Sequence, residues 1–220
     1  MSQVVVIAID GPVASGKGSV SSGVAKVLGF HVLDSGALYR LTALACMNQG
    51  MDLGDAAAAE KVARLLKPLF KDGKIYLEGK DVTDAIRTEE VGLNASKIAA
   101  YPGVRKALFE LQRRSAVEPG LVADGRDMGS VVFPEARLKI FLTASAESRA
   151  KRRYNQLKEK GISSNIDDLV SDLKDRDRRD MERSVAPLKP AEGARILDSS
   201  DLTLQETIDQ VLAWYRESKA

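Results

Sequence analysis

The stretch that most constrains the fold of this chain is residues 4–19, where an apolar run leads through a glycine-bounded loop into a helical pattern. An uninterrupted run of β-branched and small apolar residues is typical of a strand buried in a parallel sheet. After this run, Gly11, Gly16 and Lys17 have the spacing of a phosphate-binding loop, or P-loop. Glycines allow successive N–H groups to face one anion, and the N-terminus of the following helix adds positive potential. The stretch therefore predicts a nucleoside triphosphate site in which Lys17 contacts the outer phosphates.

The position after the lysine departs from the general P-loop motif. It holds Gly18, and the hydroxyl that often binds Mg²⁺ comes one residue later, at Ser19. This form of the loop resembles those of nucleoside monophosphate kinases more than those of GTPases. A glycine-rich turn that carries a lysine by chance is the alternative, but strand, spacing and helix coincide here. The predicted ATP-binding residues are Gly11, Pro12, Val13, Ala14, Ser15, Gly16, Lys17, Gly18 and Ser19.

Composition excludes several other classes of protein. At 220 residues the chain suits one domain, and its formal net charge of +2 gives no reason to expect a nucleic-acid partner. The single Cys46 rules out an intrachain disulfide and lies in an apolar helical pattern, where we expect a buried thiol. The single His31 argues against a histidine-based triad or metal site. No apolar run is long enough for a membrane helix. We expect a cytoplasmic protein without a membrane partner, and nothing in the sequence demands more than a monomer.

Strand and helix patterns alternate along most of the chain. A helix after Ser19 ends at Gly29, and a short buried strand is predicted over 30–33. Asp34 or Ser35 then caps a helix that runs to about residue 49. Three further strands are predicted at 121–123, 138–143 and 195–197, and long helices at 145–160, 166–184 and 204–215. This alternation predicts an α/β fold with a five-stranded parallel sheet flanked by helices, and ligands bind such sheets beyond the carboxyl ends of the strands.

The section from about 60 to 100 interrupts the alternation. Turn signals at 71–74 and 78–80 flank a short apolar run, Ile75 to Leu77, after an alanine-rich helix over 55–67. They predict a small antiparallel sheet over about 68–83, followed by helices over 88–100 and 102–117. We interpret residues 1–220 as a single domain that carries a small inserted lobe at about 60–100.

The helix predicted over 166–184 changes character along one face. Helical steps continue its apolar stripe with charged residues. The stripe comprises Leu169, Leu173, Arg176, Asp180 and Arg183. A solvated helix with surface ion pairs is the alternative, because Asp175, Asp177 and Arg178 surround the stripe. The functional interpretation of the same pattern is that this end of the helix lies over an anionic ligand.

Arginines are frequent near the predicted functional edge of the sheet. These arginines are Arg40, Arg105, Arg126, Arg152, Arg153, Arg176 and Arg183. The planar guanidinium binds phosphate bidentately and stays charged in a closed site. So many guanidinium groups suggest two phosphates, one on each substrate, and an acceptor that is already anionic needs no strong base.

Two functions other than phosphoryl transfer to a phosphorylated acceptor are compatible with a P-loop. A small-molecule kinase of the shikimate type would need a base for its hydroxyl acceptor, and Asp34 and Asp124 are candidates. A nucleotide-binding regulator would use the loop without any acceptor chemistry. A GTPase is disfavoured because the sequence has no Asn-Lys-x-Asp motif for reading guanine.

Longer motifs across almost the whole chain resemble bacterial cytidylate kinases. They lie at 11–19, 33–40, 86–91, 124–134, 185–188 and 197–199. The most specific are Asp124-Gly-Arg-Asp-Met-Gly129 and Asp34-Ser-Gly-x-x-Tyr-Arg40. The resemblance implies a P-loop kinase fold with an acceptor-binding insert and a short lid at about 150–184. It also implies transfer of the γ-phosphoryl group of ATP to CMP or dCMP with Mg²⁺, giving ADP and CDP or dCDP in pyrimidine nucleotide metabolism.

The resemblance also implies roles for individual residues. The implied catalytic residues are Lys17, Arg126 and Arg183, with Arg152 or Arg153 beside the last of them. The implied acceptor-binding residues are Ser35, Arg40, Ser96, Arg105, Arg126, Asp127, Arg176 and Asp180. In this set, Arg40 and Arg126 hold the CMP phosphate, Arg176 and Asp180 reach the sugar, and the others surround the cytidine, chiefly its base. No direct metal ligand is assigned, and Ser19 and Asp124 are candidates, the latter facing the water shell of Mg²⁺.

Overall fold

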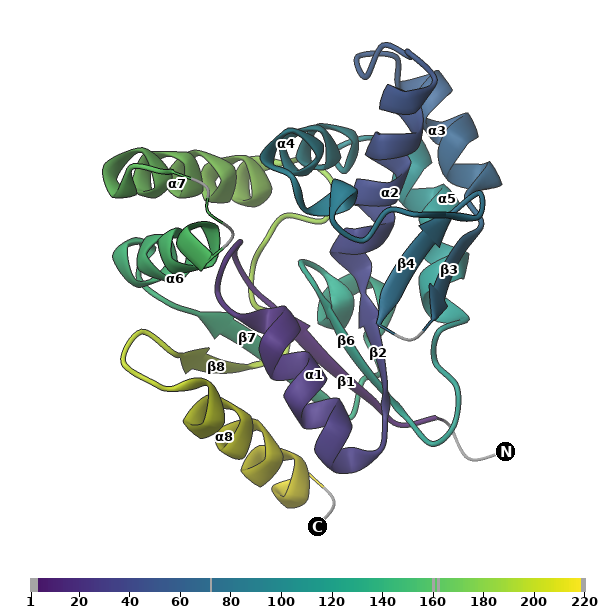
Figure 1. The fold of residues 1–220 in the computed structure, drawn as a ribbon. Coiled ribbons are helices and arrows are strands. Elements are labelled where there is room, and N and C mark those ends of the chain that lie inside the picture. Colours follow the sequence, from purple (N-terminus) through teal and green to yellow (C-terminus); the bar gives the residue numbers. More distant parts are fainter. Residues whose placement is uncertain (1–3, 72, 160, 162, 219–220) are drawn as a thin grey trace. The chain divides into compact units, whose positions relative to one another are not determined.

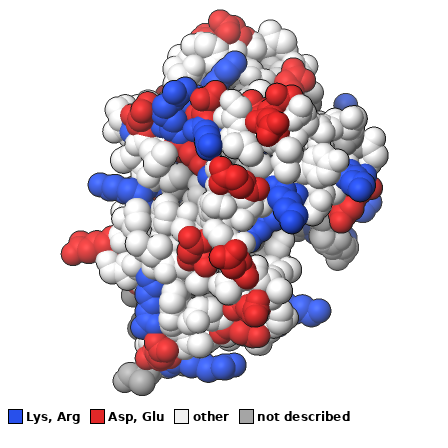
Figure 2. All heavy atoms as spheres, turned by 90° about the vertical axis from the view of Figure 1, so that its left-hand side faces the viewer, with Lys and Arg blue, Asp and Glu red and all other residues white. Residues whose placement is uncertain are grey.

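A computed structural model describes residues 4–71, 73–159, 161 and 163–218. The chain divides into two compact units, one formed by the segments up to Leu33 and from Ser115 onward, the other by Asp34–Arg114. The described part of the chain contains no helix that is both long and apolar enough to cross a membrane. On the face shown in Figure 2, basic and acidic side chains are interspersed.

The first unit is built on a five-stranded sheet (Figure 1). Its strands are β1 (Val6–Asp10), β2 (His31–Asp34), β6 (Leu121–Gly125), β7 (Leu138–Thr143) and β8 (Arg195–Asp198). Their order is β2-β6-β1-β7-β8, and β1 pairs in parallel with both β6 and β7. The predicted parallel sheet is therefore confirmed. One detail of the prediction was wrong, because β2 lies at the edge of the sheet and its His31 and Val32 are exposed rather than buried.

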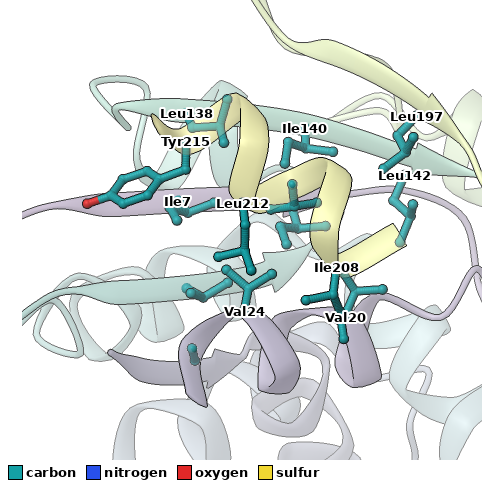
Figure 3. Close-up of a cluster of buried hydrophobic side chains, with 14 residues drawn as sticks. Ile7, Val20, Val24, Leu138, Ile140, Leu142, Leu197, Ile208, Leu212 and Tyr215 are labelled. Atoms are coloured by element: carbon teal, nitrogen blue, oxygen red, sulfur yellow. The ribbon is translucent and has the colours of Figure 1, made fainter. Parts of the chain in front are cut away.

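The α-helices in the described part of this unit are α1 (Lys17–Leu28), α6 (Ala146–Glu159), α7 (Ile166–Glu182) and α8 (Leu204–Glu217). The core lies between the sheet and the helices α1 and α8 (Figure 3). There Ile7 and Ile140 from the strands meet Val24 of α1 and Val211 of α8, and burial of such side chains is the main source of stability. Helical spacing in the segment 204–215 predicts a buried stripe of Leu204, Ile208, Val211, Leu212 and Tyr215. The prediction is wrong at Leu204, which is half exposed in the first turn of α8.

The second unit combines helices with a small sheet. Its helices are α2 (Ser35–Asn48), α3 (Ala56–Leu65), a 3₁₀ turn (Ala85–Arg87), α4 (Glu89–Ile98) and α5 (Pro102–Arg113). Its strands β3 (Pro68–Lys71), β4 (Lys74–Leu77) and β5 (Lys80–Asp81) pair antiparallel in that order. The small antiparallel sheet predicted over 68–83 is confirmed, although Asp72 in its first turn lies outside the described residues. Cys46 is buried in α2, as predicted.

Candidate active site

The P-loop leaves β1 at a position where only glycine fits. Gly11 has φ +154°, and a Cβ there would overlap the carbonyl oxygen of Leu142 in the neighbouring strand β7. Gly16 has φ +92° and caps α1 in the left-handed conformation. These values require glycine for steric reasons, as the motif predicted. The sequence pattern therefore reports a backbone constraint that tertiary packing imposes.

Basic side chains bind the carbonyl groups of this loop. Lys17 Nζ donates to the carbonyl of Pro12 at 2.7 Å, and Arg149 Nη1 donates to that of Val13 at 3.1 Å. Arg152 Nη1 donates to the carbonyl of Ser15, also at 3.1 Å. Since the C=O and N–H of a trans peptide point in opposite directions, the N–H groups of these peptides point away from the cations. That orientation suits a loop whose N–H groups receive an anion.

Lys17 lies at the centre of a buried set of charges. Its side chain is buried, and burial together with the nearby Arg126 charge lowers its pKa from 10.5 to about 7. The carboxylates of Asp124, Asp10 and Asp180 oppose this shift. The structure therefore brings the P-loop lysine within electrostatic reach of the predicted residues at the end of β6 and on α7.

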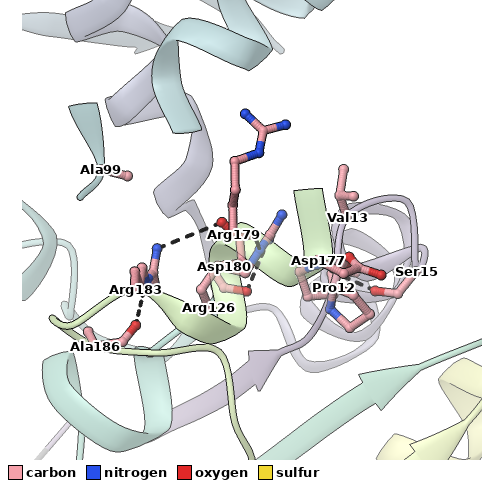
Figure 4. Close-up of polar contacts among 12 residues, drawn as sticks. Pro12, Val13, Ser15, Ala99, Arg126, Asp177, Arg179, Asp180, Arg183 and Ala186 are labelled. Carbon is pink, nitrogen blue, oxygen red and sulfur yellow. Dashed lines mark hydrogen bonds and ion pairs between the residues drawn. The ribbon is translucent and has the colours of Figure 1, made fainter. Parts of the chain in front are cut away.

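Arg126, Asp180 and Arg183 form a connected group (Figure 4). Arg126 Nε donates to Asp180 Oδ2 at 2.8 Å, and Arg183 Nη1 lies 4.0 Å from Asp180 Oδ1. Arg183 Nε also donates to the carbonyl of Ala186 at 2.6 Å. Burial raises the pKa of Asp180, but the charges of Arg126, Arg183 and Arg176 outweigh it and hold the pKa below its usual value. Asp180 is therefore buried on the predicted face, and Arg176 lies close enough to affect it, while the contact of this face with an anionic ligand stays a prediction.

Asp177 is also buried on this face of α7, although it was expected among the solvent-exposed residues around the charged stripe. The buried residues of α7 are Leu173, Asp177 and Asp180. Asp177 Oδ2 accepts a hydrogen bond from Arg149 Nη2 at 2.6 Å, and the two side chains are 12% and 6% exposed. Arg149 was not predicted as a site residue. It lies among several basic residues of the helix after Ser145, and nothing in the sequence marked it as the one that pairs with Asp177.

Asp10, which no sequence motif marked, is buried at the end of β1 and binds the segment that follows β6. Its two carboxylate oxygens accept the N–H groups of Met128 and Gly129, both at 2.8 Å. These residues begin a π-helical turn, Met128–Val132, directly after Arg126 and Asp127. Asp10 therefore ties the last residue of β1 to the segment that carries two predicted site residues. A carboxylate at the end of a parallel strand, beside the P-loop, was the available signal.

We expect Asp10 to make the stability of the protein depend on pH. Burial, reinforced by the charge of Asp127, raises its pKa from 3.8 to about 6, against the opposing N–H bonds and Lys17. The native state therefore holds a proton that the unfolded chain has already released. The contribution is full below pH 3.8 and is lost as the pH rises to about 6, a change of about 3 kcal/mol in the free energy of unfolding.

The measurement compares urea unfolding of the wild type and Asp10→Asn over this pH range. The variant cannot titrate at this position, and its amide nitrogen faces one of the two N–H groups, so it should be less stable at every pH. The difference between the two proteins should shrink as the pH rises. Parallel stability curves would contradict the assigned shift.

The predicted residues of the second unit lie on three of its helices. Arg40 of α2 donates through Nη1 to the carbonyls of Ile86 at 2.7 Å and Thr88 at 3.2 Å. A Cβ on Gly92 would lie 2.8 Å from the same guanidinium, so a glycine accommodates Arg40 at this position. Arg105 of α5 lies over the ring of Tyr39, with 5.8 Å from its Cζ to the ring centre.

Two hydroxyl groups complete the predicted residues of this unit. Ser96 is half-buried on α4. Ser35 begins α2 directly after Asp34, whose carboxylate caps the helix by accepting the N–H of Ala37 at 2.9 Å. The Ser35 hydroxyl donates to Gln112 Oε1 at 3.0 Å, and Gln112 was not predicted.

Comparison with known proteins identifies the family. Residues 7–217 match the family model described as cytidylate kinase. The chain is 59% identical over 211 residues to the cytidylate kinase of Bordetella bronchiseptica, with 96% of this chain and 95% of that protein covered. It is 56% identical to the cytidylate kinase of Cupriavidus necator, with 98% and 97% covered, and 54% identical to that of Polynucleobacter asymbioticus over the full length of both chains.

A solved gluconokinase from Sinorhizobium meliloti 1021 is similar to the chain at 16% identity and a TM-score of 0.48, covering 99% of this chain and 94% of that one. This likeness is too distant to bear on function. The range matched by the family model includes Lys17, Arg40 and Arg126. The chain therefore belongs to the cytidylate kinase family, and the predicted class, a kinase rather than a nucleotide-binding regulator, is confirmed.

Proposed function

We propose that this chain transfers the γ-phosphoryl group of ATP to CMP or dCMP, giving ADP and CDP or dCDP. The observation that carries the proposal is the buried charge cluster beside the P-loop, in which Lys17 lies close to Arg126 and Asp180. A cluster rich in cations suits the transfer of a phosphoryl group between two anions, because the reaction needs positioning and charge neutralisation more than a base. The identity of the acceptor rests on the similarity to cytidylate kinases.

On the donor side, the loop 11–19 binds the phosphates of ATP through the backbone N–H groups of its residues other than Pro12, which has none. Lys17 neutralises charge on the transferring group. Burial lowers the pKa of Lys17, and a bound anion raises it again, so that the side chain stays protonated. Arg126 has five N–H bonds, so its bonds to Asp180 and to the carbonyl of Gly125 still leave it able to donate to phosphate oxygens. Arg183 adds a second guanidinium to the same group of residues.

The acceptor-binding roles remain part of the proposal. Arg40 and Arg126 bind the CMP phosphate, and Ser35, Ser96, Arg105 and Asp127 surround the cytidine. Arg176 and Asp180 contact the sugar. In the second unit, the carbonyls of Ile86 and Thr88 hold the guanidinium of Arg40 in one orientation, which lowers the entropic cost of binding phosphate. A monomeric state and a cytoplasmic location stay predictions.

The residues beside the P-loop fit Mg²⁺. Among the described residues there is no group of three or more histidine, cysteine, aspartate or glutamate side chains that would form a closed metal site. Mg²⁺ bound with a nucleotide does not need one, because it takes phosphate oxygens, several waters and one or two protein oxygens. Asp124 is buried at the end of β6, close enough for its charge to raise the pKa of Lys17. Asp124 would face the ion or its waters, with Ser19 as a further candidate, and Mg²⁺ would neutralise the charge that develops on the phosphates.

The test is a panel of acceptors offered with ATP and Mg²⁺. The panel comprises CMP, dCMP, UMP, AMP, GMP and shikimate. We expect slow loss of ATP without an acceptor and rapid formation of ADP with CMP or dCMP. Efficient use of AMP, GMP or shikimate without use of CMP and dCMP would contradict the proposed acceptor. ATP hydrolysis that does not respond to any acceptor would favour a nucleotide-binding regulator.

A further inference from the structure

A buried amide in the second unit controls the direction of one hydroxyl. Gln112 of α5 is 2% exposed and Ser35 of α2 is 3% exposed. Gln112 Nε2 donates to the carbonyl of Leu108 at 3.2 Å, and Gln112 Oε1 accepts from the Ser35 hydroxyl at 3.0 Å. Ser35 and Gln112 are 77 positions apart in the sequence, and both belong, with Leu108, to the unit Asp34–Arg114.

The chemistry of the groups determines the direction of both bonds. A backbone carbonyl only accepts, so the NH₂ group of Gln112 must face Leu108, and the reversed amide would place two oxygens together. The amide oxygen therefore faces Ser35, and the single hydroxyl proton of Ser35 is committed to it. Towards any other group, the Ser35 oxygen can offer only lone pairs.

We propose that Gln112 is a specificity-determining residue that acts through Ser35 by making its hydroxyl an obligate acceptor. The proposal rests on the proposed function, in which Ser35 contacts the acceptor base. A base that presents a donor to this oxygen is then favoured, and a base that presents a carbonyl is rejected. Cytosine has an exocyclic amino group where uracil has a carbonyl, so this arrangement selects CMP over UMP. Because both side chains are buried, little water is at hand to compensate a wrong pairing.

The experiment measures the ratio of kcat/KM for CMP to kcat/KM for UMP at saturating ATP and Mg²⁺. Gln112→Met keeps the length of the side chain but removes the strong acceptor, so the Ser35 hydroxyl is released to donate. The ratio should fall by about tenfold or more, chiefly because UMP is used better. Gln112→Glu keeps an oxygen facing Ser35 whether the carboxyl is ionised or protonated, so it should retain the wild-type ratio even if the protein is less stable.

A double variant shows whether Gln112 acts through Ser35. Ser35→Ala should lower the ratio, and Ser35→Ala with Gln112→Met should lower it no further. A Gln112→Met protein that loses CMP and UMP turnover equally would overturn the inference, as would a double variant whose effects add. If Gln112→Met does not fold, Ser35→Ala and Gln112→Glu decide the question. A wild-type ratio of CMP to UMP use in Ser35→Ala, or a reduced ratio in Gln112→Glu, also overturns the inference.

The wild-type ratio separates the inference from the function on which it rests. A wild-type protein that does not phosphorylate CMP contradicts the proposed function. A wild-type protein that prefers CMP, while Gln112→Met retains the same preference, contradicts only the role of Gln112.

Discussion

Replacing Lys17 with alanine should lower kcat for phosphoryl transfer by about 100-fold or more. The side chain is buried, lies in the P-loop and is close to Arg126, Asp124 and Asp180. Alanine removes the only positive charge that the loop itself supplies, and loss of one preorganised charge-stabilising group typically costs two to three orders of magnitude in kcat. Steady-state kinetics with CMP and ATP measure the effect.

Lys26 offers a matched control on the same helix. It lies exposed in the last turn of α1, so Lys26→Ala removes an equal charge far along the helix from the loop. Its kcat should be close to that of the wild type. A Lys17→Ala protein with near-normal kcat, or two variants that lose activity equally, would contradict the role of Lys17 in stabilising the charge of the transferring group.

Replacing Asp177 with alanine should destabilise the protein by about 3–5 kcal/mol, because it leaves the buried Arg149 without its ion pair. The pair has an N–O distance of 2.6 Å. Arg149 also donates to the carbonyls of Ala144 and Val13, so it has little freedom to move toward water. Urea unfolding, with the slope of the transition held in common, measures the change in the free energy of unfolding.

Asp175 on the same helix provides the control. It pairs with Arg178 at 2.9 Å, but the two side chains are 56% and 64% exposed. Asp175→Ala should therefore change stability by less than about 1 kcal/mol. Equal effects at the two positions would show that the burial of Asp177 does not matter.

A double variant separates the loss of the pair from the exposure of its partner. Asp177→Ala combined with Arg149→Met removes both charges, so it should recover part of the stability lost in the single variant. Asp177 Oδ1 is buried and has no hydrogen-bond partner among the described residues, which already limits what the native pair contributes. A double variant less stable than Asp177→Ala would mean that the bonds from Arg149 to the loop outweigh the cost of its buried charge.

The strands and helices followed largely from local pattern. β7 has the predicted bounds, 138–143, because its apolar residues begin after Arg137 and the polar residue that starts the next helix, Ser145, follows closely. Thr88 and Asp34 cap their helices as short polar residues at helix starts do. Local pattern was less informative where position in the sheet matters. The run that forms β2 has the composition of a buried strand, and only its place at the edge of the sheet leaves Val32 exposed.

The candidate site was predictable where its signal was local in the sequence. Gly11, Gly16 and Lys17 follow from spacing, and Arg176 and Asp180 from helical periodicity continued beyond an apolar stripe. The resemblance to cytidylate kinases supplied the roles of Ser35, Arg40, Ser96 and Arg105, and these roles stay predictions. Periodicity also placed Leu173 correctly, yet it missed Asp177, which lies one turn further along the same buried face.

The sequence by itself determined the P-loop, the parallel sheet and the family of this protein. Backbone constraints and periodic burial require certain residue types at fixed short spacings, and these can be recognised in the sequence. Only the tertiary structure decided the partners of the buried polar groups. Arg149 meets Asp177 across 28 residues, Ser35 meets Gln112 across 77, and Asp10 meets Met128 across 118. Each of these bonds joins side chains or backbone groups of different elements, and a polar residue has the same appearance in the sequence whether it faces water or a partner. Which of the two it faces depends on how the elements pack, and that arrangement is not encoded in any one segment.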